Sequence, residues 1–497
     1  MIDLSIFAGQ RIAVLGLGRS GYNAARALQA GGAHVLAWDD DVRRRDACVA
    51  ASLPLADLGR ADWSRMDMLV LSPGIPHRHP APHPVAAMAK AASCPIVSDV
   101  ELLFRARPHA TYVGITGTNG KSTTTSLIGH MLAAAGRAVE VGGNLGTPAL
   151  TLSPLSEGGI YVLEMSSYQL EITPGMALTV AVLINISADH LDRHGGMAGY
   201  VAAKRLIFNN AGTAVIGIDD DNCRQVRDAL TRVEGLRIAT ISGSNAKADI
   251  YVEGRRLVDR ATGQTVADLS QATALPGVHN GQNAAAAYAA VRALGVGIDQ
   301  AARGLLTFPG LAHRQERIAT IRGVHYINDS KATNAEATAH ALDSYETIYW
   351  IAGGLPKEGG ITALAPFFPH VAHAFLIGTA ANEFAHTLEG RVAHTVSGDL
   401  ETALRAAHAA AQRSDRRPAV VLLSPACASF DQFANFEARG EAFRRLVGEL
   451  ARARQRDDVH RRAAHVEDAH LHREPVLGGD ARAGERHGMA ASQGLAK

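Results

Sequence analysis

A glycine-rich turn, Gly-Thr-Asn-Gly-Lys-Ser-Thr, between an apolar run and a helical run constrains the fold of this chain most. The apolar residues 111–115 predict a buried strand, and residues 122–135 predict a helix. Gly117 and Gly120 allow backbone N–H groups to converge on an anion, while the helix N-terminus and Lys121 add positive charge. The stretch therefore predicts an α/β domain with a phosphate-binding turn.

This turn departs in one respect from the strict phosphate-loop pattern. Gly114 lies one residue too far from Gly120 for the spacing G-x-x-x-x-G-K-[ST]. Ser122 still follows Lys121 and offers a hydroxyl group suited to Mg²⁺. A glycine-rich turn without a ligand is the alternative interpretation, but the strand, the lysine and the serine together favour phosphate binding.

Length and charge narrow the class of protein. A chain of 497 residues is too long for one core, so we expect about two to four domains. Hydrophobic residues make up 47% of the chain and charged residues 20%, as is typical of a globular protein. A formal net charge of +1 supplies no field that would attract a polyanion. We therefore expect no nucleic-acid partner.

The cysteines and the apolar runs indicate in which cellular compartment the protein is expected. The four cysteines show no C-x-x-C spacing and are expected as reduced, mostly buried thiols. The N-terminal residues lack the basic start and apolar core of a secretory signal. The longest apolar run, residues 176–186, is far shorter than a membrane span and predicts a buried strand. We expect a cytoplasmic enzyme without membrane insertion.

A second glycine turn lies near the N-terminus. Residues 11–15 predict a strand, G-x-G-x-x-G follows at Gly16, and a helix runs through Ala30. The next predicted strand, residues 34–38, ends at Asp39. This is the dinucleotide fingerprint, so an NAD-dependent oxidoreductase is one hypothesis, although any diphosphate can bind such a turn. A third predicted strand, residues 68–71, leads into Ser72-Pro-Gly-Ile-Pro76 at the same crevice.

Two central strands end in residues that suit a metal site. Residues 160–164 predict a strand ending in Glu164, a position at which a carboxylate can hold Mg²⁺. The strand predicted at residues 180–186 leads to Asp189-His190, and Lys204 follows in a helix. From the residues alone, Glu164 is equally compatible with a helix cap, His190 with a loop cap and Lys204 with a solvated surface lysine.

The last folded region repeats the pattern of a strand followed by a polar turn. Predicted strands at residues 324–327, 347–352 and 420–424 lead into Asn328-Asp-Ser-Lys-Ala-Thr-Asn334, Gly353-Gly-Leu-Pro-Lys357 and Pro425-Ala-Cys-Ala-Ser429. The third of these runs continues through Phe430 and Phe436 to Gly440. Without further knowledge it is a strand, a loop with a buried thiol and an amphipathic helix.

These runs together resemble the Mur ligase family, which joins amino acids to peptidoglycan precursors with ATP. The resemblance rests on G-T-N-G-K-S-T, S-P-G-I, N-D-S-K-A-T-N and S-P-A-C-A-S-x-D-Q-F-x-N-F-E-x-R-G, and it covers roughly residues 1 to 450. The last run is similar to that of the members that add D-glutamate. Members that add diaminopimelate carry D-N-P-R in this region, and the chain has no such run.

The resemblance implies a role for each motif residue. It implies ATP binding by Gly117, Thr118, Asn119, Gly120, Lys121, Ser122, Thr123, Asn280, Asn283, Arg314 and Asp329. It implies contact with a UDP-linked substrate by Leu17, Arg19, Asp39, Ser72, Pro73, Gly74, Ile75 and Asn144, and with D-glutamate by Thr333, Lys357, Ser429, Phe430 and Phe436. It implies two Mg²⁺ ions near Ser122, Glu164, His190 and Lys204, with Lys204 carbamylated by CO₂, and catalytic roles for Lys121, His190, Lys204 and Lys331.

The implied architecture is α/β with three domains. A Rossmann-like domain at residues 1–106 would bind UDP-N-acetylmuramoyl-L-alanine, and a central phosphate-loop ATPase-type domain at 107–310 would bind ATP and Mg²⁺. A second Rossmann-like domain at 311–451 would bind D-glutamate, and residues 452–497 are expected as a disordered tail of a monomer. Two other hypotheses remain open at this point: the NAD oxidoreductase, and a UDP-sugar-binding scaffold without catalytic activity.

Overall fold

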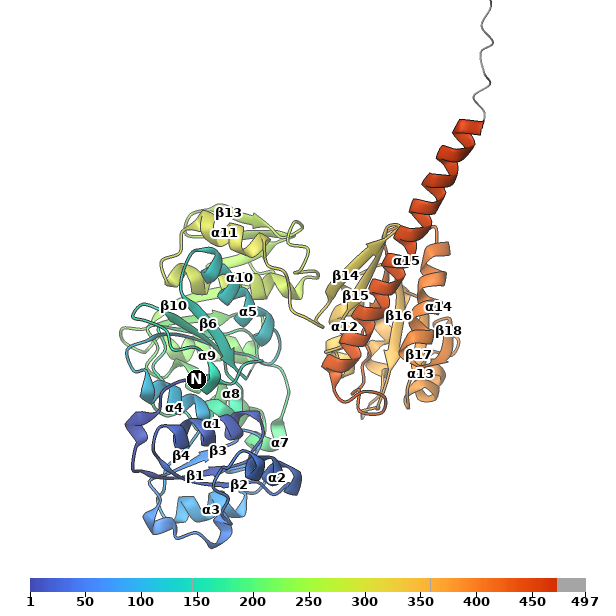
Figure 1. Cartoon of the computed structure of the whole chain (residues 1–497). Coiled ribbons are helices and arrows are strands. Elements are labelled where there is room, and N and C mark those ends of the chain that lie inside the picture. The colour runs from blue at the N-terminus through green and yellow to red at the C-terminus, as the bar shows by residue number, and fades with distance from the viewer. Residues whose placement is uncertain (145, 358, 472–497) are drawn as a thin grey trace, which may run out of the picture.

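The computed structural model describes residues 1–144, 146–357 and 359–471, and the strands in these ranges form three sheets (Figure 1). The first sheet has the order β2-β1-β3-β4 and is parallel. Its strands are β1 Arg11–Leu15, β2 His34–Trp38, β3 Met68–Leu71 and β4 Ile96–Val97. Its helices are α1 Arg19–Ala30, α2 Val42–Ala50, α3 Pro84–Ala91 and α4 Asp99–Ala106. Because β1 lies between β2 and β3, the glycine turn after β1 sits where parallel sheets open a crevice for ligands.

The central sheet has the order β13-β12-β11-β10-β9-β8-β5-β7-β6. Its strands are β5 Thr111–Thr116, β6 Val139–Gly143, β7 Ile160–Glu164, β8 Val180–Leu183, β9 Thr213–Gly217, β10 Arg237–Ser242, β11 Ile250–Glu253, β12 Arg256–Asp259 and β13 Gln264–Asp268. Its helices are α5 Lys121–Ala134, α6 Ser167–Glu171, α7 Leu191–His194, α8 Met197–Arg205, α9 Asp221–Leu230, α10 His279–Ala293 and α11 Ile298–Leu306. Strands β5 to β11 are all parallel to their neighbours among one another. Strands β12 and β13 form antiparallel pairs at one edge of the sheet.

The third sheet has the order β14-β15-β19-β16-β17-β18, with only the β14–β15 pair antiparallel. Its strands are β14 Glu316–Ile321, β15 Val324–Asn328, β16 Ile348–Gly353, β17 Val371–Ile377, β18 His394–Gly398 and β19 Ala419–Leu423. Its helices are α12 Ala335–Asp343, α13 Ala381–Leu388, α14 Leu400–Arg413 and α15 Phe436–Leu471. Since β15, β19 and β16 are neighbours and parallel, the three polar turns that follow them emerge at one edge of this sheet.

The predicted α/β class and three-sheet architecture are confirmed, and most predicted strands agree within two residues. The strand predicted at 180–186 is shorter and ends at Leu183, although the Ile184 N–H still bonds to the carbonyl of Thr116 on β5. The prediction for the tail is wrong over residues 452–471, where α15 continues to Leu471. That segment is rich in Ala and Arg, which favour a helix even without an apolar face. Residues 472–497, also predicted as disordered, lie outside the described residues.

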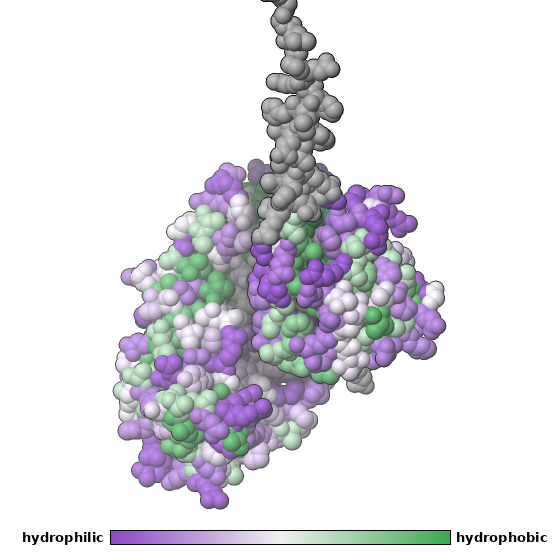
Figure 2. Space-filling model, turned by 45° about the vertical axis from the view of Figure 1, so that its right-hand side comes forward, coloured by the Kyte–Doolittle hydropathy of each residue, from purple (hydrophilic) through white to green (hydrophobic). Residues whose placement is uncertain are grey.

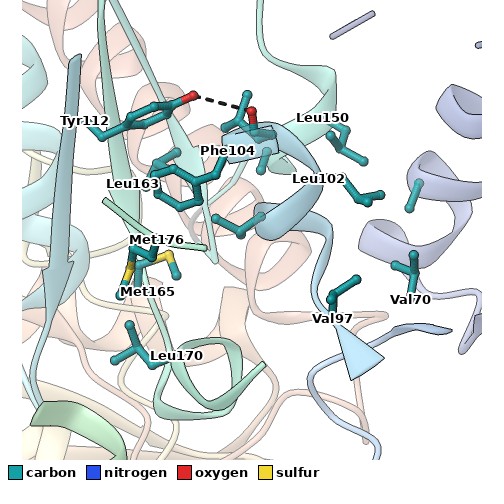
Figure 3. Packing of buried hydrophobic residues seen from close by; sticks show 14 of the residues in the cluster. Val70, Val97, Leu102, Phe104, Tyr112, Leu150, Leu163, Met165, Leu170 and Met176 are labelled. Carbon is teal, nitrogen blue, oxygen red and sulfur yellow. Dashed lines mark hydrogen bonds between the residues drawn. The ribbon is translucent and has the colours of Figure 1, made fainter. Parts of the chain in front are cut away.

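One buried apolar cluster runs through both the first and the central sheets. Leu102 and Phe104 on α4 pack with Tyr112 on β5 and Leu163 on β7 in this cluster (Figure 3). The phenyl and phenol rings of Phe104 and Tyr112 lie 4.4 Å apart, and Tyr112 donates to the carbonyl of Leu103. Fully burying such a side chain contributes about 1.5–3 kcal/mol. The first two sheets are therefore joined by a shared core.

The body around the third sheet has its own buried clusters, one on each face of the sheet. It lies beside the other two sheets, and the chain enters it after α11 (Figure 1). Figure 2 shows a groove between this body and the rest of the molecule. Within the described ranges, no helix combines the length and the apolar character that crossing a bilayer requires.

Candidate active site

The turn predicted to bind phosphate lies between β5 and α5. Gly117 has a φ of 157° and Gly120 a φ of 84°, and Gly120 is the N-cap of α5. A Cβ atom added at Gly120 would lie 2.1 Å from Oδ1 of Asn283. Both the backbone conformation and the close approach of Asn283 therefore require glycine here. The helix N-terminus and its N–H groups face the turn, as anion binding needs.

Two lysine ammonium groups meet at this turn. Nζ of Lys121 donates to the carbonyl oxygens of Gly117 and Thr118 at 2.9 and 2.7 Å. Nζ of Lys204, whose side chain is buried, donates to the Gly117 carbonyl at 2.7 Å and lies 4.6 Å from the ring of Tyr200. Burial lowers the pKa of Lys204 well below its usual value, and the charge of Lys121 lowers it further. Lys204 is thus not a solvated surface lysine.

Glu164 closes the next strand and faces the same region. Its Oε1 accepts a hydrogen bond from Nδ2 of Asn144 at 2.7 Å. Its Oε2 is buried and has no hydrogen-bond partner among the described residues. An unpartnered buried carboxylate oxygen is costly unless a cation or donor meets it. The helix-cap interpretation of Glu164 is therefore not supported, because Ser166 forms the cap of α6.

His190 lies at the N-cap of the short helix α7 with a left-handed φ of 51°. Its ring is half exposed, and Nε2 lies 3.4 Å from Oδ2 of Asp189. Among residues 1–144, 146–357 and 359–471, no three His, Cys, Asp or Glu side chains group as a metal site would. The predicted metal set differs from such a group, since it combines Glu164 and His190 with a serine and a modified lysine.

A cavity of roughly 300 Å³ lies between the central and third sheets. Asn280 and Asn283, predicted to share a helix face, are hydrogen-bonded at 2.9 Å, and Asn283 also accepts from Thr124. Arg314 bonds through Nη2 to Oγ of Ser122 at 2.8 Å. The cavity lining brings together predicted residues from both sheets: Asn119, Gly120, Thr123, Asn280, Asn283, Arg314, Asp329 and Lys331.

Across this cavity, two motifs of the third sheet meet. Nζ of Lys331, in the turn after β15, lies 3.9 Å from the ring centroid of Phe436, in the run after β19. Asp329 is buried, accepting from Ser424 Oγ at 2.7 Å and from the Gln315 N–H at 3.2 Å. Burial raises the pKa of Asp329 to about 7. Ser429 is buried as well.

Other predicted residues of the third sheet are more exposed. The Phe430 side chain is 70% exposed, Lys357 is exposed and Thr333 is partly exposed. Leu355 is also exposed, and its N–H bonds to the carbonyl of Ala428 at 2.9 Å. The turn after β16 therefore lies against the turn after β19.

The residues predicted for a UDP-linked substrate gather at the carboxyl ends of β1, β2 and β3, except Asn144, which follows β6 in the central sheet and bonds to Glu164. Oδ2 of Asp39 accepts from the Leu17 N–H at 2.6 Å, and Oγ of Ser72 donates to the Gly16 carbonyl at 2.9 Å. Burial raises the pKa of Asp39, but hydrogen bonds from Leu17, Asp41 and Arg44 outweigh it and the pKa is lowered overall. Arg19 begins α1, and Pro73 and Gly74 follow Ser72.

Sequence reasoning missed several side chains that shape the site. Arg439 is buried and bonds to Ser330 and to the Cys427 carbonyl, so it fastens two motif turns together. His279 and His340 both line the cavity, and their ring centroids lie 4.8 Å apart. Arg439 lies within the quoted F-E-x-R-G run and was detectable, whereas the histidine pair joins two sheets and leaves no local signal.

Fold and site define a three-sheet α/β protein with a phosphate-type turn that faces a separate body across a cavity. The model of the Mur ligase middle domain matches residues 115–291. The UDP-N-acetylmuramoylalanine–D-glutamate ligase of Rhodospirillum rubrum is 51% identical over 465 residues, which cover 91% of this chain and 98% of the relative. That of Caulobacter sp. strain K31 is 52% identical, covering 91% and 99%. The chain belongs to the Mur ligase family.

Solved structures agree in fold. UDP-N-acetylmuramate–alanine ligase of Thermotoga maritima gives a TM-score of 0.56 at 17% identity, covering 89% of this chain and 99% of that one. The MurF ligase of the same organism, solved in complex with ADP, gives a TM-score of 0.54 at 18% sequence identity. The match covers 90% of this chain and 97% of that one. At such identities the likeness supports the fold.

All four cysteines are free and buried, as predicted.

Proposed function

We propose that this chain ligates D-glutamate to UDP-N-acetylmuramoyl-L-alanine with ATP, in the synthesis of peptidoglycan precursors. The observation that carries the proposal is the identity of 51–52% over nine-tenths of the chain with ligases named for this reaction. The NAD oxidoreductase hypothesis leaves Lys121, Lys204 and the buried Asp329 without a role. The scaffold hypothesis leaves the two lysines at one carbonyl unexplained.

The substrates divide among the three parts of the chain. Residues 1–106 bind the UDP-linked substrate through the turn after β1 and through Ser72, Pro73, Gly74 and Ile75. Residues 107–310 bind ATP, with its phosphates at the turn before α5 and its base near Asn280 and Asn283. Residues 311–451 bind D-glutamate near Thr333, Lys357, Ser429, Phe430 and Phe436. The cavity between the central and third sheets supports this division, because it holds room for a nucleotide.

Ser122, Glu164, His190 and Lys204 would hold two Mg²⁺ ions. The buried, unpartnered Oε2 of Glu164 fits a hard cation, which prefers carboxylate oxygen. Burial lowers the pKa of Lys204 well below its usual value, so its amine would add to CO₂ with release of one proton, and the resulting carbamate would supply an anionic oxygen ligand. When bound, the ions neutralise charge where ATP and a carboxylate approach each other.

The reaction runs in two balanced steps. A carboxylate oxygen of the alanyl group attacks the γ-phosphorus of ATP, which gives an acyl phosphate and ADP. The amine of D-glutamate then attacks the acyl carbon, loses a proton, and phosphate leaves as the amide forms. Lys121 orients the transferred phosphate, and Lys331, partly buried and fixed over Phe436, stabilises the charge that develops. We further propose a monomer that works in the cytoplasm.

Phosphate release from ATP tests the proposal. The protein receives ATP, Mg²⁺ and UDP-N-acetylmuramoyl-L-alanine, together with D-glutamate, L-glutamate or diaminopimelate. Release that requires D-glutamate is expected. Release with diaminopimelate instead would assign the chain to another reaction of the family, and no release with any amino acid would refute the proposal.

A further inference from the structure

Arg193 connects the central sheet to the turn after β3. Its Nη1 donates to the carbonyl oxygen of Gly74 at 3.0 Å, and its Nη2 donates to that of Pro73 at 3.4 Å. These residues are 119 and 120 positions apart in the chain. One guanidinium thus holds two successive carbonyl groups of the turn proposed to bind the UDP-linked substrate, in the forked geometry that arginine favours.

The segment that carries Arg193 also carries His190. Helix α7 is bracketed by two left-handed residues, His190 at its N-cap and Gly195 at its C-cap, with φ of 51° and 68°. The Gly196 N–H bonds to the Leu191 carbonyl at 2.8 Å and closes the segment. Arg193 therefore cannot shift far without moving the backbone of His190.

A third element packs against the same guanidinium. Arg193 lies over the ring of Tyr168 with 4.6 Å between the guanidinium carbon and the ring centroid. The Tyr168 ring is 5.3 Å from the ring of His190. Tyr168 lies on α6, whose start is fixed by the capping box of Ser166 and Gln169 directly after Glu164 and Met165. The turns after β3, β7 and β8 thus converge on one side chain.

Holding the carbonyls also orients the N–H groups of the turn. In a trans peptide the Pro73 carbonyl and the Gly74 N–H point in opposite directions within one plane. Since Arg193 holds the carbonyl, the Gly74 N–H points away from Arg193. Gly74 is exposed, and a Cβ there would meet no atom within 4 Å, so the turn is open to solvent at this residue.

We infer that Arg193 is a positioning residue for the ligation reaction: it aligns the Ser72–Ile75 turn, and hence the UDP-linked substrate, with the segment that carries His190. This inference rests on the proposed function and deepens it. Among the described residues, the Arg193 side chain donates hydrogen bonds to Pro73 and Gly74, so we expect its effect to fall mainly on the UDP-linked substrate. Lysine in its place keeps the charge but offers no fork for two carbonyls.

The test compares Arg193→Met, which keeps the apolar contact with Tyr168, with Arg193→Lys. Arg260→Met is the matched control, because Arg260 also donates to a backbone carbonyl, that of Lys247 at 3.0 Å, far from the site. We expect Arg193→Met to raise KM for the UDP-linked substrate about tenfold, with KM for ATP unchanged within twofold. Arg193→Lys should fall between the two, and the control should match the wild type.

Calorimetric binding of UDP-N-acetylmuramoyl-L-alanine, measured without turnover, separates this inference from the proposed function. Wild-type binding without phosphate release would refute the proposed reaction, and weaker binding by Arg193→Met would still support the positioning role. Equal binding and equal KM in wild type and Arg193→Met would overturn the inference. An equal rise in KM for ATP and for the UDP-linked substrate would also overturn it, because that pattern indicates general structural damage.

Discussion

Lys121 and Lys204 donate to the same acceptor, the carbonyl oxygen of Gly117, at 2.9 and 2.7 Å. Two ammonium groups at one carbonyl repel each other. This repulsion lowers the free energy needed to remove a proton from one of them. Lys204 is the more deeply buried of the two, and burial together with the charge of Lys121 lowers its pKa. Burial lowers the pKa of Lys121 as well, and the close approach of the two amines favours loss of a proton from Lys204, the more deeply buried of the two.

The carbamylation proposed for Lys204 can be tested directly. After addition of ¹³C-bicarbonate, we expect a carbamate resonance in the ¹³C NMR spectrum of the wild type. Lys204→Arg should lack that resonance and lose ligase activity by at least about a hundredfold, because a guanidinium forms no carbamate and supplies no anionic ligand. Arg205→Lys, at an adjacent position on α8, is the control and should keep the resonance. A Lys204→Arg variant with full activity would contradict this role.

Gly120→Ala should abolish the use of ATP through a steric effect. The new Cβ would lie 2.1 Å from Oδ1 of Asn283, in a backbone conformation that costs about 1–2 kcal/mol for other residues. Gly136→Ala is the matched control, because Gly136 follows the same helix at a φ of 78° and has open space around it. Both variants carry the backbone cost, and only Gly120→Ala should raise KM for ATP.

Equilibrium binding of ATP checks that comparison. A similar dissociation constant in the two alanine variants would mean that strain, and not contact with Asn283, determines the effect.

Arg439 should be a major determinant of stability in the third sheet. It bonds to Oγ and the carbonyl of Ser330 and to the Cys427 carbonyl at 3.0–3.1 Å while almost fully buried. Arg439→Met leaves these acceptors unpaired. We therefore expect the free energy of unfolding, measured in urea, to fall by about 2–4 kcal/mol. Arg445→Met, which removes an exposed ion pair with Glu449 on the same helix, should change the free energy of unfolding by under about 0.5 kcal/mol. Equal effects of both variants would contradict the prediction.

Asp329 should give the apo protein a distinct pH dependence. Burial raises its pKa to about 7 in the folded state, against 3.8 as the reference for an accessible carboxyl group. Between these values the folded state binds more protons than the unfolded state, so its stability falls as the pH rises through 7. The contribution is fully present below about pH 4 and is lost above 7.

Urea unfolding of the wild type and Asp329→Asn from pH 5 to 8 measures this effect. The free energy of the wild type should fall relative to that of the variant over this range. Parallel curves for the two proteins would show that Asp329 keeps an ordinary pKa.

The sequence predicted best where an apolar run meets a glycine or proline turn. The strands ending at Leu71 and at Glu164 agree with the prediction to the residue, because burial of a short apolar run and a turn signal are both local properties. The pairing of Asn280 with Asn283 was also predictable, since residues three apart share a helix face.

Contacts between distant segments were beyond that reasoning. Arg193 looks like an ordinary charged residue of a short helix, and nothing near it in sequence indicates that it reaches Pro73 and Gly74. The extension of α15 to Leu471 was missed for a different reason, because its helix-forming composition carries no apolar periodicity. The division into residues 1–106, 107–310 and 311–451 stays a prediction.

The buried cluster that joins Leu102 and Phe104 to Tyr112 and Leu163 has a mechanical consequence. Separating the first sheet from the central one would expose this apolar surface to water, at a cost of about 25 cal/mol for each Å². The body of the third sheet keeps both its clusters to itself, so moving it relative to the other two sheets would expose neither cluster. Opening of the nucleotide cavity is therefore expected to separate this body from the first two sheets, which stay together.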